Sequence, residues 1–446
     1  MDWSAGFVYI VWYTTKKSPA MIDTQIDPDG VLLARIDMPG RAMNVFSREL
    51  MDALARLMAR AEEEPRVRAV VLTSGKSAFL AGADLEMIKM FTERAHDGTS
   101  EELHDLFGHL GRLFRRLELH PKPFIAAING LALGGGLELC LACQARVVAD
   151  DPAIQLGLPE IKLGLFPGAG GTQRLPRLIG AGSGLRMLLT GEPVGPTEAL
   201  KLGLVNEVVP AERLIETAKR RALTLHGHRA PWDREGAWFD PTPFDFSTPG
   251  AHTAIAAATG ITGYQLRRYP AYRAIMDCVI GGWGLPMTQA GEHEMSVFVE
   301  LMRDPVAGNM VRTLFLNRQK AAKLGLLNPD SPYAAGREAF LPRLRATRDQ
   351  LKALGCNEDE SVLAVAFTAI KVWAEGGIEH PDLADAAAVN AGLFPSWTGG
   401  PYNYVRQAGA QRLRAEADTA ARKDAALFAV PAALDRFLRP LVTLSA

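Results

Sequence analysis

Short apolar runs alternate with helically spaced hydrophobic positions through the first half of the chain. The apolar runs, which are rich in Val, Ile, Leu and Ala, predict buried strands. We expect strands at Val31–Ile36, Ala69–Thr73, Phe124–Ile128 and Arg146–Ala149, with shorter ones at Leu156–Glu160 and Leu204–Val209. Leucines that recur at three- and four-residue steps predict a helix over Ser47–Glu64, and another helix opens at Asp84–Phe91. This alternation predicts an α/β fold.

The second half of the chain is mostly helical in pattern. Residues 229–250 are rich in Pro, Asp, Phe and Gly, which predicts an irregular connection. Apolar positions such as Met295, Phe298 and Met302 predict helices over 251–325, and breaks are expected at Gly376–Gly377 and in the aromatic, glycine-rich loop Phe394–Tyr404. The domains expected are an N-terminal extension at 1–20, an α/β domain at 21–250, a helical linker at 251–335 and a helical domain at 336–446.

The composition is that of a globular protein rather than a disordered, collagen-like or disulfide-stapled chain. Hydrophobic residues make up 48% of the 446 residues and charged residues 22%, and the formal net charge is -1. Because there is no basic excess, we expect no nucleic-acid partner and no binding to an anionic membrane. Four cysteines are too few for a disulfide framework, so a cytoplasmic location is expected.

Two apolar stretches raise the question of a membrane or export signal. Phe124–Cys143 has the length of a membrane span, but the glycines and the ionisable Glu138 inside it favour a strand, a turn and a helix. Met1–Thr15 has no basic residues before its apolar part. We therefore predict no membrane span and no signal peptide.

The stretch Ala132–Glu138 contains three consecutive glycines between a predicted strand and a predicted helix. Glycines there let the backbone approach a ligand closely, and the free N–H groups of the new helix carry partial positive charge. This pattern predicts an anion or oxyanion site. Glu138 follows in apolar surroundings, and the sequence supplies no cation before Arg146. We therefore favour a functional carboxylate over a buried structural ion pair.

A second carboxylate, Glu160, lies 22 residues further along the chain. Pro159 and Gly164 bracket it, so we expect a short, stiff turn. An ordinary exposed pair with Lys162 is the alternative interpretation. Beside Glu138 and an oxyanion site, Glu160 becomes a candidate for paired acid–base chemistry.

The stretch Ala78–Asp84 ends a predicted strand in small residues. Asp84 is expected to cap the next helix, which is a structural role. The backbone N–H of Ala83 is the functional candidate, because two such N–H groups, one after each strand, can converge on one carbonyl oxygen and stabilise its developing charge.

Cys140 and Cys143 have the CxxC spacing of metal and redox sites. They lie on the apolar helix that carries Glu138, and no second ligand pair follows at metal spacing. We therefore expect core packing and no metal.

Three segments resemble the crotonase, or enoyl-CoA hydratase/isomerase, family. They are AFLAGADL at 78–85, AAINGLALGGGLEL at 126–139 and LGLPEIKLGLFPGAGGTQRLPRLIG at 156–180. The resemblance runs from about Val31 to Val209 and implies a crotonase-like spiral of ββα units with a fatty acyl-CoA thioester as the substrate. The N–H groups of Ala83 and Gly135 would hold the thioester oxygen, and Glu138 and Glu160 would flank a water.

The resemblance implies hydration of trans-2-enoyl-CoA in fatty-acid β-oxidation, because hydratases of this family need both glutamates. The family more often assigns the C2 proton to Glu160 and the water to Glu138, but which one is base and which is acid stays open. A Δ3,Δ2-enoyl-CoA isomerase is the alternative. Arg41, Ala81 and Lys89 are the expected CoA contacts, because they lie near loops that bind CoA in the family.

Two later regions resemble the alpha subunits of bacterial fatty-acid oxidation complexes. Residues 251–325 resemble the segment after the hydratase domain, and 359–405 resemble the helical end of the 3-hydroxyacyl-CoA dehydrogenase. The NAD-binding domain that lies between them in the family has no counterpart here, where about 35 residues intervene without a GxGxxG motif. We therefore expect no NAD and no other cofactor, and an all-α C-terminal region.

The same resemblance implies partners. A thiolase subunit and a homo-oligomer are the protein partners expected, beside the acyl-CoA substrate. A docking subunit of a β-oxidation complex, without catalysis of its own, is the alternative from a different class of protein.

Overall fold

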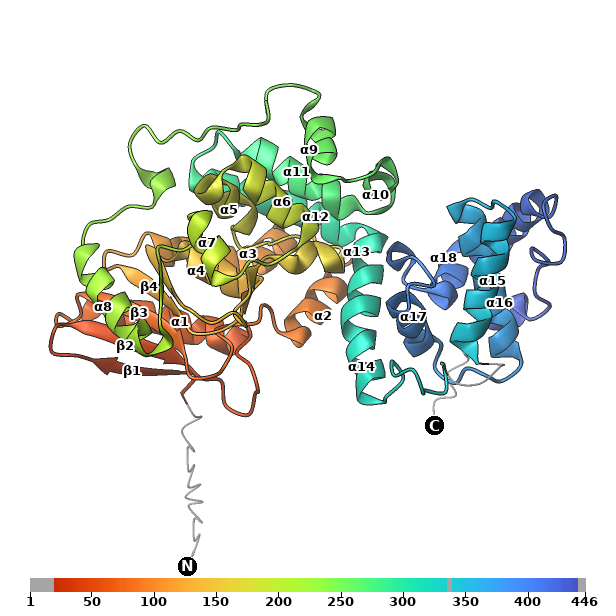
Figure 1. Ribbon diagram of the computed structural model, residues 1–446, viewed down its shortest axis with the longest axis horizontal. Coiled ribbons are helices and arrows are strands. Elements are labelled where there is room, and N and C mark those ends of the chain that lie inside the picture. The colour runs from red at the N-terminus through yellow and green to blue at the C-terminus, as the bar shows by residue number, and fades with distance from the viewer. Residues whose placement is uncertain (1–19, 335–338, 440–446) are drawn as a thin grey trace, which may run out of the picture.

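The computed structural model describes residues 20–334 and 339–439, so the N-terminal extension expected at 1–20 lies outside the described residues apart from Ala20. Figure 1 shows two lobes, a larger one that contains the sheet and a smaller helical one. Between them, α13 (Pro305–Met310), the π-helix η4 (Val311–Asn317) and α14 (Arg318–Lys323) run as one rod.

The strands of the larger lobe form a six-stranded sheet and a two-stranded sheet. The first pair of the larger sheet is antiparallel and every later pair is parallel. Its order is β1 (Ile22–Ile26), β2 (Val31–Ile36), β3 (Ala69–Ser74), β4 (Phe124–Ile128), β6 (Ala145–Ala149) and β8 (Glu207–Val209). The smaller sheet pairs β5 (Ala132–Leu133) with β7 (Leu156–Gly157). β3, β4 and β6 are buried along their whole length, as parallel strands covered on both faces are.

The strands predicted at Val31–Ile36 and Phe124–Ile128 are confirmed, whereas two predicted strands are shorter than expected. The prediction for Leu156–Glu160 was wrong beyond Gly157, because Pro159 lacks an N–H and starts the 3₁₀-helix η1 (Pro159–Leu163). At Leu204–Val209 the extended part begins only at Glu207, since the N–H of Leu204 first closes a turn onto Ala199 O at 2.8 Å.

The helices of the larger lobe begin where the sequence supplies caps. The Ser47 side chain accepts from Leu50 N at the start of α1, and Thr99 and Glu102 form a capping box on α3. The helical elements up to residue 233 are α1 (Arg48–Glu63), α2 (Leu85–Arg94), α3 (Ser100–Glu118), α4 (Gly135–Ala142), α5 (Gly171–Ile179), α6 (Ala181–Thr190), α7 (Pro196–Lys201), η2 (Ala211–Arg213), α8 (Leu214–Thr224) and η3 (Pro231–Asp233).

Residues beyond 250 complete the core of the larger lobe. They form α9 (Ala251–Thr259), α10 (Gly263–Arg268), α11 (Pro270–Gly282) and α12 (Met287–Arg303). One hydrophobic core runs from Val31 to Val311, and α12 packs against α3, α5 and α11. The domain limits expected at residues 250 and 335 stay predictions, but the helical segment after residue 250 is packed into the sheet domain rather than suspended between lobes.

The smaller lobe has its own hydrophobic core, to which Tyr333, Phe340 and Tyr402 contribute. Its helices are α15 (Phe340–Ala353), α16 (Glu358–Ala374), α17 (Pro381–Asn390), η5 (Ser396–Thr398), α18 (Pro401–Ala420) and α19 (Leu434–Leu438). The break at Gly376–Gly377 is confirmed. The loop expected over Phe394–Tyr404 is shorter, because α18 already begins at Pro401, where the buried Asp385 accepts from the N–H groups of Tyr402 and Asn403.

Cys140 and Cys143 are free thiols buried in the core of the larger lobe, which confirms the packing role predicted for them. Within 20–334 and 339–439, no cluster of three His, Cys, Asp or Glu side chains is suited to a metal ion. No helix in these same ranges is long and apolar enough to cross a bilayer.

Candidate active site

A cavity of about 780 Å³ lies in the larger lobe. Its wall is formed by the segment after β3, by the start of α4, by η1, and by α2 and α3, while α12 and η4 contribute side chains from beyond residue 290. The segments that carry the predicted site residues therefore meet at one cavity, although they are far apart in the sequence.

Ala83 and Gly135 both line this cavity. Ala83 forms a parallel bridge with Phe46, in which Phe46 N donates to Gly82 O and Asp84 N donates to Phe46 O, each at 2.8 Å. This pairing turns the N–H of Ala83 itself away from the Phe46 strand. Gly135 is the first residue of α4, where a helix has no internal acceptor for its N–H. Neither N–H donates to an acceptor within the described residues.

The glycines before α4 are required by close contacts. Gly134 has a φ of +56°, and a Cβ there would lie 2.8 Å from Glu160 Oε1. A Cβ on Gly136 would lie 2.2 Å from the carbonyl oxygen of Leu80. The backbone of this turn therefore lies close to both the segment after β3 and the second carboxylate, which a side chain at either glycine would prevent.

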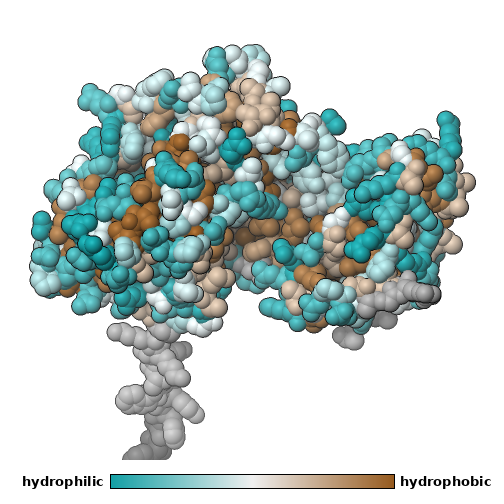
Figure 2. All heavy atoms as spheres, viewed as in Figure 1, coloured by the Kyte–Doolittle hydropathy of each residue, from teal (hydrophilic) through white to brown (hydrophobic). Residues whose placement is uncertain are grey.

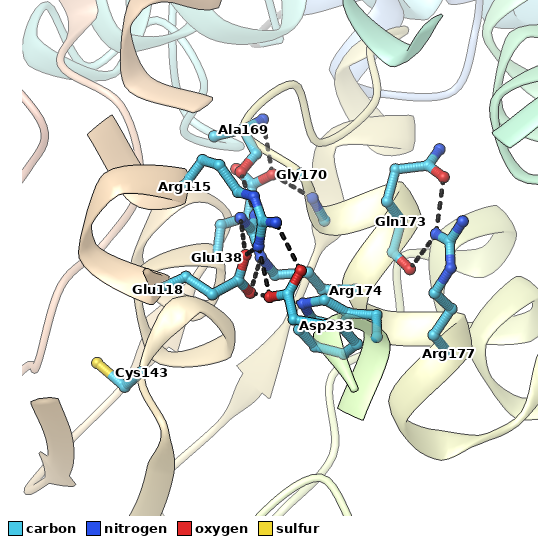
Figure 3. A network of polar contacts seen from close by, with 12 residues as sticks. Arg115, Glu118, Glu138, Cys143, Ala169, Gly170, Gln173, Arg174, Arg177 and Asp233 are labelled. Carbon is cyan, nitrogen blue, oxygen red and sulfur yellow. Dashed lines mark hydrogen bonds and ion pairs between the residues drawn. The ribbon is translucent and has the colours of Figure 1, made fainter. Parts of the chain in front are cut away.

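Glu138 lies on α4 and is buried, with 3% of its surface exposed. Its Oε1 accepts from the N–H groups of Ala169 and Gly171, each at 2.8 Å, and Figure 3 shows it beside this turn. The alternative of a structural ion pair with Arg146 does not hold, because Arg146 donates to the carbonyl oxygens of Leu204, Cys140 and Cys143. Burial raises the pKa of Glu138 to about 7, although the two N–H donors act to lower it.

Glu160 lies on η1 at the wall of the cavity, and its Oε2 atom is buried without a hydrogen-bond partner. Burial raises the pKa of Glu160 well above its ordinary value, and the charge of Glu138 raises it further. Lys162 pairs with Glu192 at 2.8 Å, so the exposed Glu160–Lys162 pair that the sequence left open does not form. The two glutamates are thus coupled carboxyl groups on one cavity.

Of the three expected CoA contacts, two line the cavity and one does not. Ala81 and Arg41 line the cavity, and Arg41 forms an ion pair with Asp84 at 2.6 Å. Lys89 does not line it, and its exposed side chain lies 3.8 Å from Glu93. Asp84 accepts from Glu86 N at 2.8 Å and caps α2, as predicted.

Sequence reasoning missed Glu294, a buried carboxylate on α12. Its Oε1 accepts from Gly170 N at 2.7 Å, and its Oε2 accepts from the N–H and hydroxyl of Thr172. The signal was present, because Ala290, Glu294, Phe298 and Met302 recur every four residues and so share one helix face. A Glu inside an apolar stripe marks a buried carboxylate, but the stripe alone does not reveal what that carboxylate contacts.

A buried ion network supports the turn that includes Ala169 (Figure 3). Arg174 on α5 donates to both oxygens of Glu118 and to the carbonyl oxygen of Ala169. Arg115 links Glu118 to Asp233. Each charge in this network has an opposite charge beside it, so Glu118 has a structural role. Glu138 differs, because it has no ion pair within the described residues.

This chain is similar in sequence to known proteins of fatty-acid oxidation. The enoyl-CoA hydratase/isomerase family model matches residues 28–230. The fatty acid oxidation complex subunit alpha of Shewanella putrefaciens is 40% identical over 276 residues, which cover 61% of this chain and 38% of that protein. The same subunit of Shewanella halifaxensis is 36% identical over 299 residues, covering 67% of this chain and 41% of that protein. This chain therefore matches about two fifths of the length of these relatives.

Among solved structures, the enoyl-CoA hydratase of Bacillus anthracis aligns at 29% identity with a TM-score of 0.40, covering 68% of this chain and 96% of that one. The family match includes the segments that carry Ala83, Gly135, Glu138 and Glu160. Residues 28–230 of this chain therefore match the enoyl-CoA hydratase/isomerase family.

Proposed function

We propose that this protein is an enoyl-CoA hydratase, which adds water across the double bond of trans-2-enoyl-CoA thioesters in fatty-acid oxidation. The observation that supports the proposal is that Glu138 and Glu160 line the same cavity as Ala83 and Gly135. Hydration needs a base that takes a proton from the water attacking C3 and an acid that gives a proton to C2. Two carboxyl groups can fill these two roles.

The environments of the two glutamates support a division of labour. Burial raises the pKa of both carboxyl groups, but two backbone N–H groups donate to Glu138 and favour its ionised form, whereas Glu160 Oε2 has no hydrogen-bond partner among the described residues. Near neutral pH the pair therefore holds one proton preferentially on Glu160. In the proposed mechanism Glu138 accepts a proton from the water that attacks C3, and Glu160 delivers its proton to C2.

The two backbone N–H groups have the role of an oxyanion hole in this proposal. Addition of water at C3 moves negative charge onto the thioester oxygen, and Ala83 N–H and Gly135 N–H would donate to that oxygen. Loss of one such donor typically costs about 10²–10³-fold in rate. The start of α4 adds the positive end of a helix dipole at the same point.

The apolar part of the cavity supports a fatty acyl chain as the group beside the thioester. Phe298 and Met302 on α12 and Phe315 on η4 line it together with side chains of α2 and α3. Arg41 and Ala81 lie on the same wall, where the CoA part of the substrate would bind. We also propose that the reaction needs neither NAD nor another cofactor, and that a thiolase and further copies of this chain are its protein partners.

The test is an assay with purified protein on trans-2-enoyl-CoA and, separately, on 3-enoyl-CoA, each with and without NAD. We expect trans-2-enoyl-CoA to be converted to 3-hydroxyacyl-CoA at a rate that NAD does not change. Conversion of 3-enoyl-CoA to the 2-enoyl isomer without any hydration would identify an isomerase instead. Formation of NADH would contradict the absence of a nicotinamide requirement.

A further inference from the structure

The turn Gly168–Thr172, which we call the clamp turn, is held by two buried carboxylates that approach it from different elements. Glu138 on α4 accepts from the N–H groups of Ala169 and Gly171, and Glu294 on α12 accepts from those of Gly170 and Thr172. Four consecutive N–H groups are thus divided alternately between the two carboxylates. The start of α5 lies in the same turn, so its helix dipole favours negative charge on both.

The carbonyl side of the clamp turn is held by Arg174, whose Nη1 donates to Ala169 O and whose backbone N–H donates to Gly170 O, each at 2.9 Å. Gly170 has a φ of +97°, and a Cβ there would lie 1.9 Å from Arg174 Nη1. A Cβ on Gly171 would lie 2.8 Å from Glu138 Oε1. Side chains are therefore disfavoured at both positions, and the hydrogen bonds to the two carboxylates fix the N–H groups of the turn. A displacement of Gly170 would carry the N–H groups of Ala169 and Gly171 with it, and with them the Glu138 carboxylate.

Packing alone does not account for Glu294. The side chain is 1% exposed and forms no ion pair within the described residues, and burying a carboxylate without a cation opposes folding. The same helix face supplies Phe298 and Met302 to the cavity wall, so α12 approaches both the clamp turn and the cavity. Glu294 therefore connects α12, which lies outside residues 28–230, with the turn whose N–H groups donate to Glu138.

We propose that Glu294 is a positioning residue of the hydratase reaction, which holds the clamp turn in the arrangement that orients the Glu138 carboxylate. This inference rests on the proposed hydratase function. Glu294 does not touch substrate. It acts on the rate of the chemical step through Glu138, and α12 is thereby part of the working site although it lies outside residues 28–230.

The test compares Glu294→Ala and Glu294→Gln with Met295→Ala, a control for lost packing at the adjacent buried position of α12. Each variant is measured for kcat and KM on trans-2-enoyl-CoA and for hydrogen exchange of the peptide that contains residues 169–172. We expect Glu294→Ala to lower kcat by about 10²-fold, the cost typical of a small misplacement of a reacting group, with KM nearly unchanged. Exchange in the clamp turn should become faster.

Glu294→Gln should recover part of the lost rate, because its carbonyl oxygen still accepts from Gly170 N, although its amide nitrogen cannot accept from Thr172 N as Oε2 does. If Glu294→Ala does not fold, Glu294→Asp replaces it, since the shorter side chain reaches only part of the turn and should also lower kcat. An unchanged kcat in Glu294→Ala or Glu294→Asp, an equal loss in Met295→Ala, or a Gln variant as slow as the Ala variant would each overturn the inference. Wild-type protein without hydration would overturn the proposed function and this inference together.

Discussion

Glu138 and Glu294 of the larger lobe are buried, Glu160 is half-buried with its Oε2 atom buried, and none of the three forms an ion pair among the described residues. Glu118 shows the contrasting arrangement, because Arg115 and Arg174 neutralise it. A carboxylate buried only for structure is stabilised by such cations. Because these three carboxyl groups have no cation beside them in the described part of the chain, their ionisation at high pH destabilises the fold. Such an arrangement is expected at a site that needs carboxyl groups which still hold protons near neutral pH.

This burial predicts a pH-dependent stability. Burial raises the pKa of Glu294 from an ordinary value of 4.5 to about 8. Between these values the folded protein keeps a proton that the unfolded chain has released, so the free energy of unfolding falls as pH rises, by up to about 1.4 kcal/mol per pH unit. Glu294→Gln has no proton to lose. Its Tm relative to wild type should therefore increase from about pH 5 to about pH 9, and a Tm difference independent of pH would contradict the burial of an ionisable group there.

At this scale the sequence predicted most of the site. Glu138, Glu160, Ala83 and Gly135 lie in local patterns whose chemistry is readable, and the structure brings all four to one cavity. Their roles stay predictions. Glu294 was missed because its partners are backbone N–H groups of a distant turn, and no local pattern shows which turn a buried carboxylate will reach.

At the scale of elements, α12 does more than cover the sheet domain. Glu294 contacts the clamp turn, while Phe298 and Met302 on the same face line the cavity. The sequence predicted this helix and its apolar positions, but it could not show that the face would meet the site, because that depends on how α12 packs against α3 and α5.

This position predicts that α12 influences the choice of acyl chain. Met302→Ala removes a side chain from the cavity wall, whereas Met295→Ala removes one of equal size that does not line the cavity. Both variants should lose about 2–5 kcal/mol of unfolding free energy, because both positions are buried. Only Met302→Ala should raise kcat/KM for long relative to short enoyl-CoA chains, by about tenfold. Equal chain-length profiles in the two variants would show that Met302 does not border the acyl chain.

At the scale of the whole molecule, the smaller lobe docks on the rod between the lobes through apolar contacts, such as that of Leu314 with its hydrophobic core, and through hydrogen bonds. Asn309 Nδ2 donates to Trp397 O at 3.1 Å, and Thr313 Oγ1 donates to Gly399 O at 2.9 Å. Figure 2 shows hydrophobic side chains in the recess between the lobes, within a largely hydrophilic surface. The helical character of this lobe was readable from periodicity, but its docking was not, because the contacts depend on the three-dimensional shapes of the turns at 396–400.

Truncation after Lys323 should therefore separate the functions of the lobes. The cavity is lined by residues no later than Phe315, so the truncated protein should hydrate enoyl-CoA with kcat/KM close to that of the full chain. The face of η4 that packs against α17 would become exposed, and solubility should fall or the mass in solution should rise. Size-exclusion chromatography with light scattering, followed by the hydration assay, measures both. A soluble, monodisperse product without hydration would show that the smaller lobe helps to form the site.

The central claim is that Glu138 and Glu160 act as a pair, and their Gln variants test it most directly in the hydration assay described above. Gln keeps the size of Glu but cannot transfer a proton, a contribution that is typically about 10²–10⁴-fold in rate. We expect Glu138→Gln and Glu160→Gln each to lower kcat for trans-2-enoyl-CoA by about that factor, and the double variant to be little slower than the slower single one. Hydration at nearly the wild-type rate by either correctly folded single variant would contradict the paired mechanism.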